Sequence, residues 1–163
     1  MKYFLIVFVF LTAPLFAEHP GWLMVEEEVG AEVAKPQITV VRLWAPWCPN
    51  SRAEDEGEGW AKFIAANPNV QFVFVTVRSS DDGVAYLAGQ GVGEQANLKL
   101  RHHPNFVRKG LGSIEYFMDI PISWVPTTWV FREGKLRYAI NYGEVRFPML
   151  QQMIADTASA WNH

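Results

Sequence analysis

Two short stretches carry most of the structural information in this sequence: Trp47-Cys48-Pro49-Asn50-Ser51 and, further along, Val125-Pro126-Thr127. The residues before the first stretch, 38–44, are rich in β-branched and aromatic side chains, which is typical of a strand. Proline suits the first turn of a helix, because its missing N–H would have no partner there, so a helix is expected to begin at Pro49. The sequence therefore predicts that Cys48 lies where a strand ends and a helix begins.

The segments that follow alternate between helix and strand patterns. Residues 60–64 place apolar side chains at helical spacing, although glycines at 57 and 59 weaken that helix. Residues 70–77 form a near-continuous apolar run, as expected for a strand covered on both faces. Beyond them we expect a short helix at 81–87 capped by two aspartates, an irregular segment at 94–122 with buried residues at 106–107 and 114–118, a strand at 127–131, a turn at 133–134, a partner strand at 136–141 and an amphipathic helix at 147–161. This order predicts an α/β fold with a central mixed β-sheet and helices on both of its faces.

The N-terminal residues are typical of a secretory signal peptide. Lys2 is followed by an unbroken apolar run, 3–10, which residues 11–17 extend as far as the small residue Ala17. The alternative, an uncleaved membrane anchor, is less consistent with this stretch, because a spanning helix needs about 20 apolar residues. We therefore expect an exported protein, periplasmic or otherwise extracytoplasmic, that keeps no membrane span after cleavage.

The remaining chain is expected to form one domain. We assign residues 1–17 to the signal peptide, 18–36 to an N-terminal extension and 37–163 to the folded domain. Within the extension, 22–25 is expected to form a short leading strand, and the acidic residues at 26–28 a surface or loop.

The composition excludes several classes of protein. The chain has 163 residues, 50% hydrophobic and 19% charged, which favours one domain with a packed core over disorder. The net charge is −3 and no clustered basic face is evident, so no nucleic-acid partner is expected. The chain has a single cysteine, so it cannot form an intramolecular disulfide in an oxidising compartment.

The predicted position of Cys48 suits a reactive thiol. The free N–H groups and the positive end of a helix dipole stabilise a thiolate, and only the thiolate attacks a disulfide. Trp44 and Trp47 are expected to flank the cysteine and to give a flat apolar surface for a peptide substrate. The alternative is an inert, partly buried thiol on a scaffold that has lost its redox function.

Residues 44–54 resemble the active-site stretch of the thioredoxin superfamily, and most closely its exported TlpA/ResA-like branch. Val125-Pro126-Thr127 matches the loop of that fold in which a cis-proline faces the cysteine. The resemblance extends over roughly residues 37–163, because the following hairpin and Gly143 also match. It implies a thioredoxin-like fold.

The resemblance also implies roles for individual residues. Cys48 matches the attacking cysteine, with Trp47, Pro49 and Asn50 as its neighbours in the motif. Pro126 matches the cis-proline, which would leave the backbone of Val125 free to pair with an extended substrate segment, with Trp44 and Thr127 in the same groove. Glu54 matches a glutamate that lies near the cysteines in this branch and influences their titration.

Two residues depart from the family pattern. Ser51 stands where the second, resolving cysteine should be, and Arg42 stands where classical thioredoxins carry a buried aspartate. A serine cannot release a mixed disulfide, although its hydroxyl can donate a hydrogen bond to the Cys48 thiolate. The sequence therefore predicts monothiol chemistry, in which an external thiol or a second cysteine of a protein substrate completes the reaction. No cofactor or metal is expected.

Simpler interpretations stand beside these. Ser51 can satisfy backbone N–H groups of the first helical turn, and Glu54 can be a surface acid beside Asp55 on a solvated helix face. His102 and His103 are expected in a solvated loop rather than at a metal, since no further ligands have suitable spacing. For the whole protein, the main alternative is a redox-inactive binding or chaperone module that uses the cis-proline groove. A peroxidase has little support, because its cysteine normally sits in a different motif.

Overall fold

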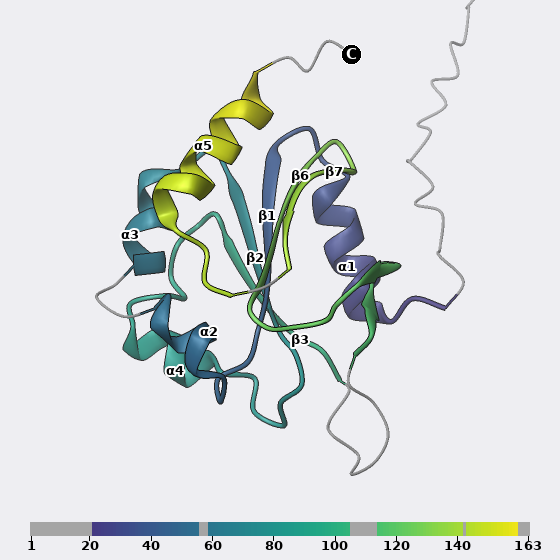
Figure 1. Cartoon of the computed structure of the whole chain (residues 1–163), viewed down its shortest axis with the longest axis vertical. Helices are drawn as coiled ribbons and strands as arrows, with labels where there is room; N and C mark the ends of the chain where they lie inside the picture. The colour runs from purple at the N-terminus through teal and green to yellow at the C-terminus, as the bar shows by residue number, and fades with distance from the viewer. Residues whose placement is uncertain (1–20, 56–58, 105–113, 142, 160–163) are drawn as a thin grey trace, which may run out of the picture.

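A mixed β-sheet lies at the centre of the computed structural model, which describes residues 21–55, 59–104, 114–141 and 143–159 (Figure 1). The main strands are β1 (Ile38–Trp44), β2 (Gln71–Thr76), β3 (Leu98–His102), β6 (Thr127–Arg132) and β7 (Lys135–Ile140), and a small hairpin is formed by β4 (Tyr116–Phe117) and β5 (Ile120–Pro121). The helices are α1 (Met24–Val33), α2 (Pro49–Ala53), α3 (Gly59–Ala66), α4 (Val84–Gly89) and α5 (Phe147–Ala158). The predictions for residues 1–17, for 106–107 and for Trp161 lie outside the described residues.

Strand β1 is the central strand of the sheet, whose order is β3-β2-β1-β6-β7. It pairs in parallel with β2 and antiparallel with β6, so that Val41 lies opposite Val73 on one side and Trp129 on the other. The parallel pairing of β2 with β3 and the antiparallel β6–β7 hairpin complete the sheet. The predicted central mixed sheet is confirmed.

The two faces of the sheet are covered by different helices (Figure 1). Side chains alternate along β1, so Val41 and Leu43 join a core cluster with α1, while Val40 and Trp44 join a second cluster with α3 and α5. Arg42 lies between Val40 and Trp44 in this alternation and is fully buried. A charged side chain is therefore enclosed in an aromatic layer. Within the described ranges, no helix is both long and apolar enough to cross a membrane.

The N-terminal segment differs from its prediction. Residues expected as a leading strand instead begin helix α1, which buries Val25, Val29 and Val33 against the sheet. These valines recur every four residues, which is the spacing of one helix face. Glu26 is buried as well: its carboxylate accepts hydrogen bonds from the Leu23 N–H at 2.8 Å and the Met118 N–H at 2.7 Å. The expected acidic surface is therefore only partly present.

The region after Cys48 forms two short helices. α2 ends at Ala53 and α3 begins at Gly59, with residues 56–58 outside the described ranges. A Cβ on Gly59 would lie 2.7 Å from the Glu54 carbonyl oxygen and 2.7 Å from the Phe147 ring. The glycine that weakens the helical pattern is thus a point of close contact between these segments.

Gly83 gives a test of how closely the β1–α2 region is packed. This residue has a φ of +72°, and an added Cβ would lie 2.5 Å from the indole of Trp44. We expect Gly83→Ala to lower the free energy of unfolding by about 2 kcal/mol or more, through overpacking and backbone strain. Gly89, the last residue of α4, has nothing within 4 Å of an added Cβ, so Gly89→Ala serves as the control. Urea unfolding of Gly83→Ala and Gly89→Ala would contradict this expectation if both variants matched the wild type.

Candidate functional site

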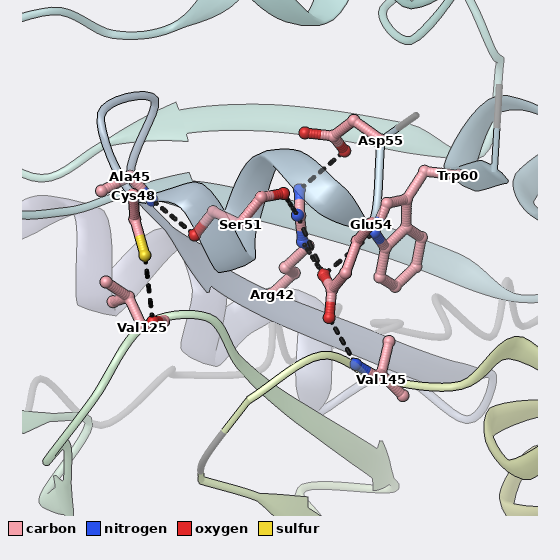
Figure 2. A network of polar contacts seen from close by, with 9 residues as sticks. All are labelled: Arg42, Ala45, Cys48, Ser51, Glu54, Asp55, Trp60, Val125 and Val145. Carbon is pink, nitrogen blue, oxygen red and sulfur yellow. Dashed lines mark hydrogen bonds and ion pairs between the residues drawn. The ribbon is translucent and has the colours of Figure 1, made fainter. Parts of the chain in front are cut away.

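Cys48 lies at the N-cap of α2, directly after the turn that follows β1 (Figure 2). Its side chain is 8% exposed, and its thiol donates a hydrogen bond to the Val125 carbonyl oxygen at 3.4 Å. The peptide bond between Val125 and Pro126 is cis. The structure thus brings together the two sequence stretches that were predicted to meet.

The tryptophans around the cysteine take different positions. Trp47 is 57% exposed, and its indole N–H donates a hydrogen bond to the Arg78 carbonyl oxygen at 2.7 Å. Trp124, next to Val125, is 59% exposed. Trp44 is fully buried, so the prediction that it offers a surface to a peptide is wrong. The alternation of side chains along β1 turns its ring into the aromatic core.

The other predicted neighbours divide between surface and interior. Pro49 and Asn50 are exposed at the start of α2. Thr127 is buried, and its hydroxyl donates a hydrogen bond to the Trp124 carbonyl oxygen at 2.8 Å. Thr127 therefore holds the loop that carries Val125 rather than offering its side chain to a substrate.

Ser51 is fully buried in α2, three residues after Cys48. Its hydroxyl accepts a hydrogen bond from the Ala45 N–H at 3.3 Å, while the Cys48 thiol faces Val125. Its described contact is therefore with the backbone of the 45–48 turn rather than with the sulfur.

A buried ionic network lies beside α2 (Figure 2). The Arg42 guanidinium contacts Oε2 of Glu54 through Nε and Nη2, both at 2.9 Å. Its Nη1 lies 3.2 Å from Oδ1 of Asp55, and its Nη2 donates a hydrogen bond to the Ser51 carbonyl oxygen at 2.6 Å. One strand residue thus contacts three residues of the segment that follows the cysteine.

Glu54 has further partners within this network. Its Oε2 accepts a hydrogen bond from the Trp60 indole N–H at 3.2 Å, and its Oε1 accepts one from the Val145 N–H at 2.5 Å. Glu54 and Asp55 are 5% and 0% exposed, so the interpretation of both as acids on a solvated helix face is wrong. These acidic side chains lie in the interior because the buried guanidinium of Arg42 needs a counter-charge.

The two carboxyl groups compete for one cation. Burial raises the pKa of Glu54, against the opposing attraction of Arg42. Burial also raises the pKa of Asp55, to about 6, and the nearby charge of Glu54 adds to that rise while Arg42 opposes it. Glu54 accepts several hydrogen bonds, whereas the buried Oδ2 of Asp55 accepts none from the described residues. Asp55 is therefore the carboxyl group of this network that takes up a proton as pH falls through about 6.

The sequence carries one signal for this network, a charge inside an apolar strand. Arg42 interrupts an otherwise apolar run, and two acids follow it after one turn and a short helix. A charge within a central strand requires a partner close in space.

The histidine pair also differs from its prediction. His102 ends β3, and His103 is buried, with its ring centroid 6.0 Å from that of Phe117. The prediction of a solvated loop is wrong, because the backbone N–H of His103 donates a hydrogen bond to the Thr76 carbonyl oxygen. This bond extends the pairing of β2 with β3. Among the described residues, no group of three or more His, Cys, Asp or Glu side chains is arranged to hold a metal ion.

Asp55 gives the stability of the protein a specific pH dependence. Its pKa is higher in the folded state than its ordinary value of 3.8, so the folded protein binds this proton more tightly than the unfolded chain. The resulting stabilisation is complete below pH 3.8 and is lost as pH rises through about 6. Wild type should therefore lose about 2 to 3 kcal/mol relative to Asp55→Asn across that window.

Urea unfolding at several values from pH 4 to pH 7 measures this difference. Glu144→Gln, at an exposed position, controls for the loss of one carboxylate. A constant stability difference between wild type and Asp55→Asn over the whole range would show that Asp55 does not bind the proton.

Comparison with solved structures identifies the fold. A secreted disulfide oxidoreductase of Mycobacterium tuberculosis, homologous to E. coli DsbE, is 22% identical with a TM-score of 0.58, over 77% of this chain and 85% of that one. A thiol:disulfide interchange protein of the thioredoxin family from Chlorobium tepidum TLS is 19% identical with a TM-score of 0.56, over 77% and 83%. A secreted thiol-disulfide isomerase of Corynebacterium glutamicum is 16% identical with a TM-score of 0.54, over 77% and 75%. No family model and no curated protein matches the sequence. The chain has a thioredoxin-like fold.

Proposed function

We propose that this chain is an extracytoplasmic thiol–disulfide protein that acts through Cys48 as a single nucleophile. One observation carries the proposal: on a thioredoxin-like fold, the thiol lies at the N-cap of α2 and faces the Val125 carbonyl oxygen at 3.4 Å. A sulfur in this place is next to a backbone with which an extended substrate segment can pair.

The reaction that one thiol can perform is disulfide exchange. The Cys48 thiolate attacks one sulfur of a substrate disulfide, a new S–S bond forms to Cys48, and the second substrate sulfur leaves as a thiolate. Another thiolate of the substrate then attacks the substrate sulfur of this mixed disulfide and releases Cys48 as a thiolate. Bonds and electrons balance, and the substrate is isomerised without net oxidation or reduction. With an external thiol, the same attack leaves that thiol joined to the substrate.

The chain has no second thiol to complete a dithiol cycle. Cys48 is the single cysteine of the sequence, and the hydroxyl of Ser51 accepts a hydrogen bond from Ala45. The resolving thiol must therefore come from the substrate or from the surrounding medium.

Two exposed indoles support a polypeptide substrate. Trp47 and Trp124 are more than half exposed, and each is next in sequence to one of the two partners, Cys48 and Val125. Exposed aromatic side chains are common at protein-binding surfaces. A cysteine-bearing segment with apolar neighbours fits this surface.

An extracytoplasmic location is part of the proposal. Lys2 and the apolar stretch at 3–17 are typical of a cleaved signal peptide. Two of the similar structures are proteins described as secreted, from Mycobacterium tuberculosis and Corynebacterium glutamicum. Because α1 packs into the core, we propose that the mature folded unit includes residues 24–33 together with 37–163.

One observation favours a second function, a redox-inactive binding or chaperone module. The Cys48 side chain is only 8% exposed, whereas Trp47 and Trp124 are 57% and 59% exposed. A surface that offers aromatic rings more openly than its sulfur can bind a segment without exchanging disulfides.

Disulfide reduction separates the two functions. With insulin as substrate and excess reduced glutathione as the external thiol, we expect Cys48→Ser to lower the rate enhancement about tenfold or more, because only a thiolate forms the mixed disulfide. The uncatalysed rate with glutathione alone is the baseline. Equal rates for wild type and Cys48→Ser would contradict the thiol function and support the binding module.

Restoring the second thiol is the complementary test. Ser51 is buried at the position that a resolving cysteine would occupy, so Ser51→Cys should allow Cys48 to be released within the chain. We expect an internal disulfide after oxidation and insulin reduction that no longer requires glutathione when another reductant recycles the pair. Ser51→Ala is the control, since it removes the hydroxyl without adding a thiol. Failure of Ser51→Cys to form the bond would show that position 51 does not face the sulfur.

A further inference from the structure

Helix α2 needs support from outside itself. It has five residues and its N-cap is Cys48, and within the part of the chain that the structure describes no side chain caps its first turn. Isolated helices shorter than about 12 residues are marginal in water, so a five-residue helix keeps its place only through contacts with the rest of the fold. The position of the Cys48 sulfur therefore depends on what holds α2 against the sheet.

Arg42 makes the polar contacts that hold the end of this helix. Its guanidinium bonds the Ser51 carbonyl oxygen at 2.6 Å, Glu54 at 2.9 Å and Asp55 at 3.2 Å. The planar guanidinium offers N–H groups in fixed directions, so these acceptors are bound in a defined arrangement. A lysine has one ammonium group and cannot reproduce that arrangement.

Arg42 is itself held firmly. It belongs to the central strand β1, and its Cζ lies between 5.1 and 5.4 Å from the ring centroids of Trp44, Trp60 and Phe74. Its side chain is fully buried. The guanidinium is therefore a rigid anchor.

A continuous set of hydrogen bonds joins the anchored segment to the cysteine. The Arg52 N–H donates to the Cys48 carbonyl oxygen at 3.1 Å, and the Cys48 N–H donates to the Ala45 carbonyl oxygen at 3.0 Å. The Ser51 hydroxyl accepts from the Ala45 N–H at 3.3 Å. Movement of Ser51 would therefore move the backbone that carries the sulfur.

We propose that Arg42 is a positioning residue for Cys48: by binding residues 51, 54 and 55 it fixes α2 and places the thiol against Val125. This role rests on the function proposed above. Arg42 touches neither the sulfur nor a substrate, so it acts only through α2. The loss of its geometry should impair the reaction of Cys48 in a protein whose sheet is intact.

Arg42→Lys in the full chain tests this role with two measurements. The first is the rate of mixed-disulfide formation between Cys48 and oxidised glutathione at pH 7, which we expect to fall about tenfold, since small displacements of a reacting group have effects of this size or larger. The second is hydrogen exchange of the Arg52 amide, which reports the Arg52–Cys48 hydrogen bond. We expect it to accelerate more than the amides of β1 and β2 do.

Ile154→Ala is the matched control. Ile154 is a buried residue of α5 in the same core cluster as Trp60, and it lies outside α2. Its substitution should lower stability without changing the glutathione rate or the relative exchange of Arg52. If this control slowed Cys48 as much as Arg42→Lys does, general destabilisation would explain the effect and the positioning role would fail.

A second variant covers the case in which Arg42→Lys does not fold. Glu54→Gln keeps the size of the side chain and an oxygen for Val145 but weakens the pairing with Arg42, so a smaller change in the same direction is expected. A folded Arg42→Lys or Glu54→Gln protein with wild-type glutathione rate and wild-type Arg52 exchange would overturn the proposal. If wild-type Cys48 forms no mixed disulfide at all, the thiol function fails, and Arg52 exchange alone then decides whether Arg42 holds α2.

Discussion

The pairing of the buried Arg42 guanidinium with Glu54 is the constraint on which the arrangement around the cysteine depends. A cation in the middle of a sheet loses its hydration and has to be neutralised where it lies. Here the counter-charge comes from Glu54, with Asp55 beside it, and the chain supplies both residues immediately after α2. Removing one member of such a pair typically costs about 3 to 5 kcal/mol, because the remaining charge is left buried without a partner. The direction of the chain after Cys48 is therefore set by an electrostatic requirement as well as by apolar packing.

This pairing also changes what Glu54 is available to do. By resemblance, a glutamate at this position is expected near the cysteine and in electrostatic contact with it. In the structure its carboxylate is occupied by Arg42, Trp60 and the Val145 N–H. The Glu54 carboxylate links the central strand β1, α3 and the segment before α5, and its role there is structural. The carboxyl group whose pKa burial raises to about 6 is that of Asp55, whose buried Oδ2 accepts no hydrogen bond from the described residues.

The surface beside Cys48 combines a nearly covered thiol with exposed aromatic rings. The thiol is nearly covered, whereas Trp47, its neighbour in sequence, and Trp124, the neighbour of Val125, are more than half exposed. In the proposed function, these rings bind an apolar segment before its disulfide meets the sulfur. Selection of the substrate and exchange of its disulfide then depend on different residues, so substitutions at each can be separated in binding and rate measurements.

Local patterns were sufficient for much of the fold. The strands at 38–44, 70–77 and 127–131, the hairpin after them and the closing helix follow from periodicity, turn residues and β-branched composition, all of which act over a few neighbouring residues. The meeting of Cys48 with Val125 was also expected, because two motifs in the right order indicated it. Helix α1 was not predicted, although its buried valines recur at the four-residue spacing of one helix face.

The burial of particular polar and aromatic side chains could not be obtained in this way. The residue types of Arg42, Asp55 and Trp44 do not indicate that these side chains are buried. Each is fully buried because folding brings it against residues that are distant in the chain or across a turn. Arg42 within an apolar run indicates a buried charge, but which group neutralises it depends on which strands pair and which helix covers them. The sequence alone established the thioredoxin-like framework, because short motifs indicate it, and the single thiol, because the chain has one cysteine. The ionic support beneath that thiol exists only once β1, α2 and α3 have assembled, since its energy comes from groups that folding brings together.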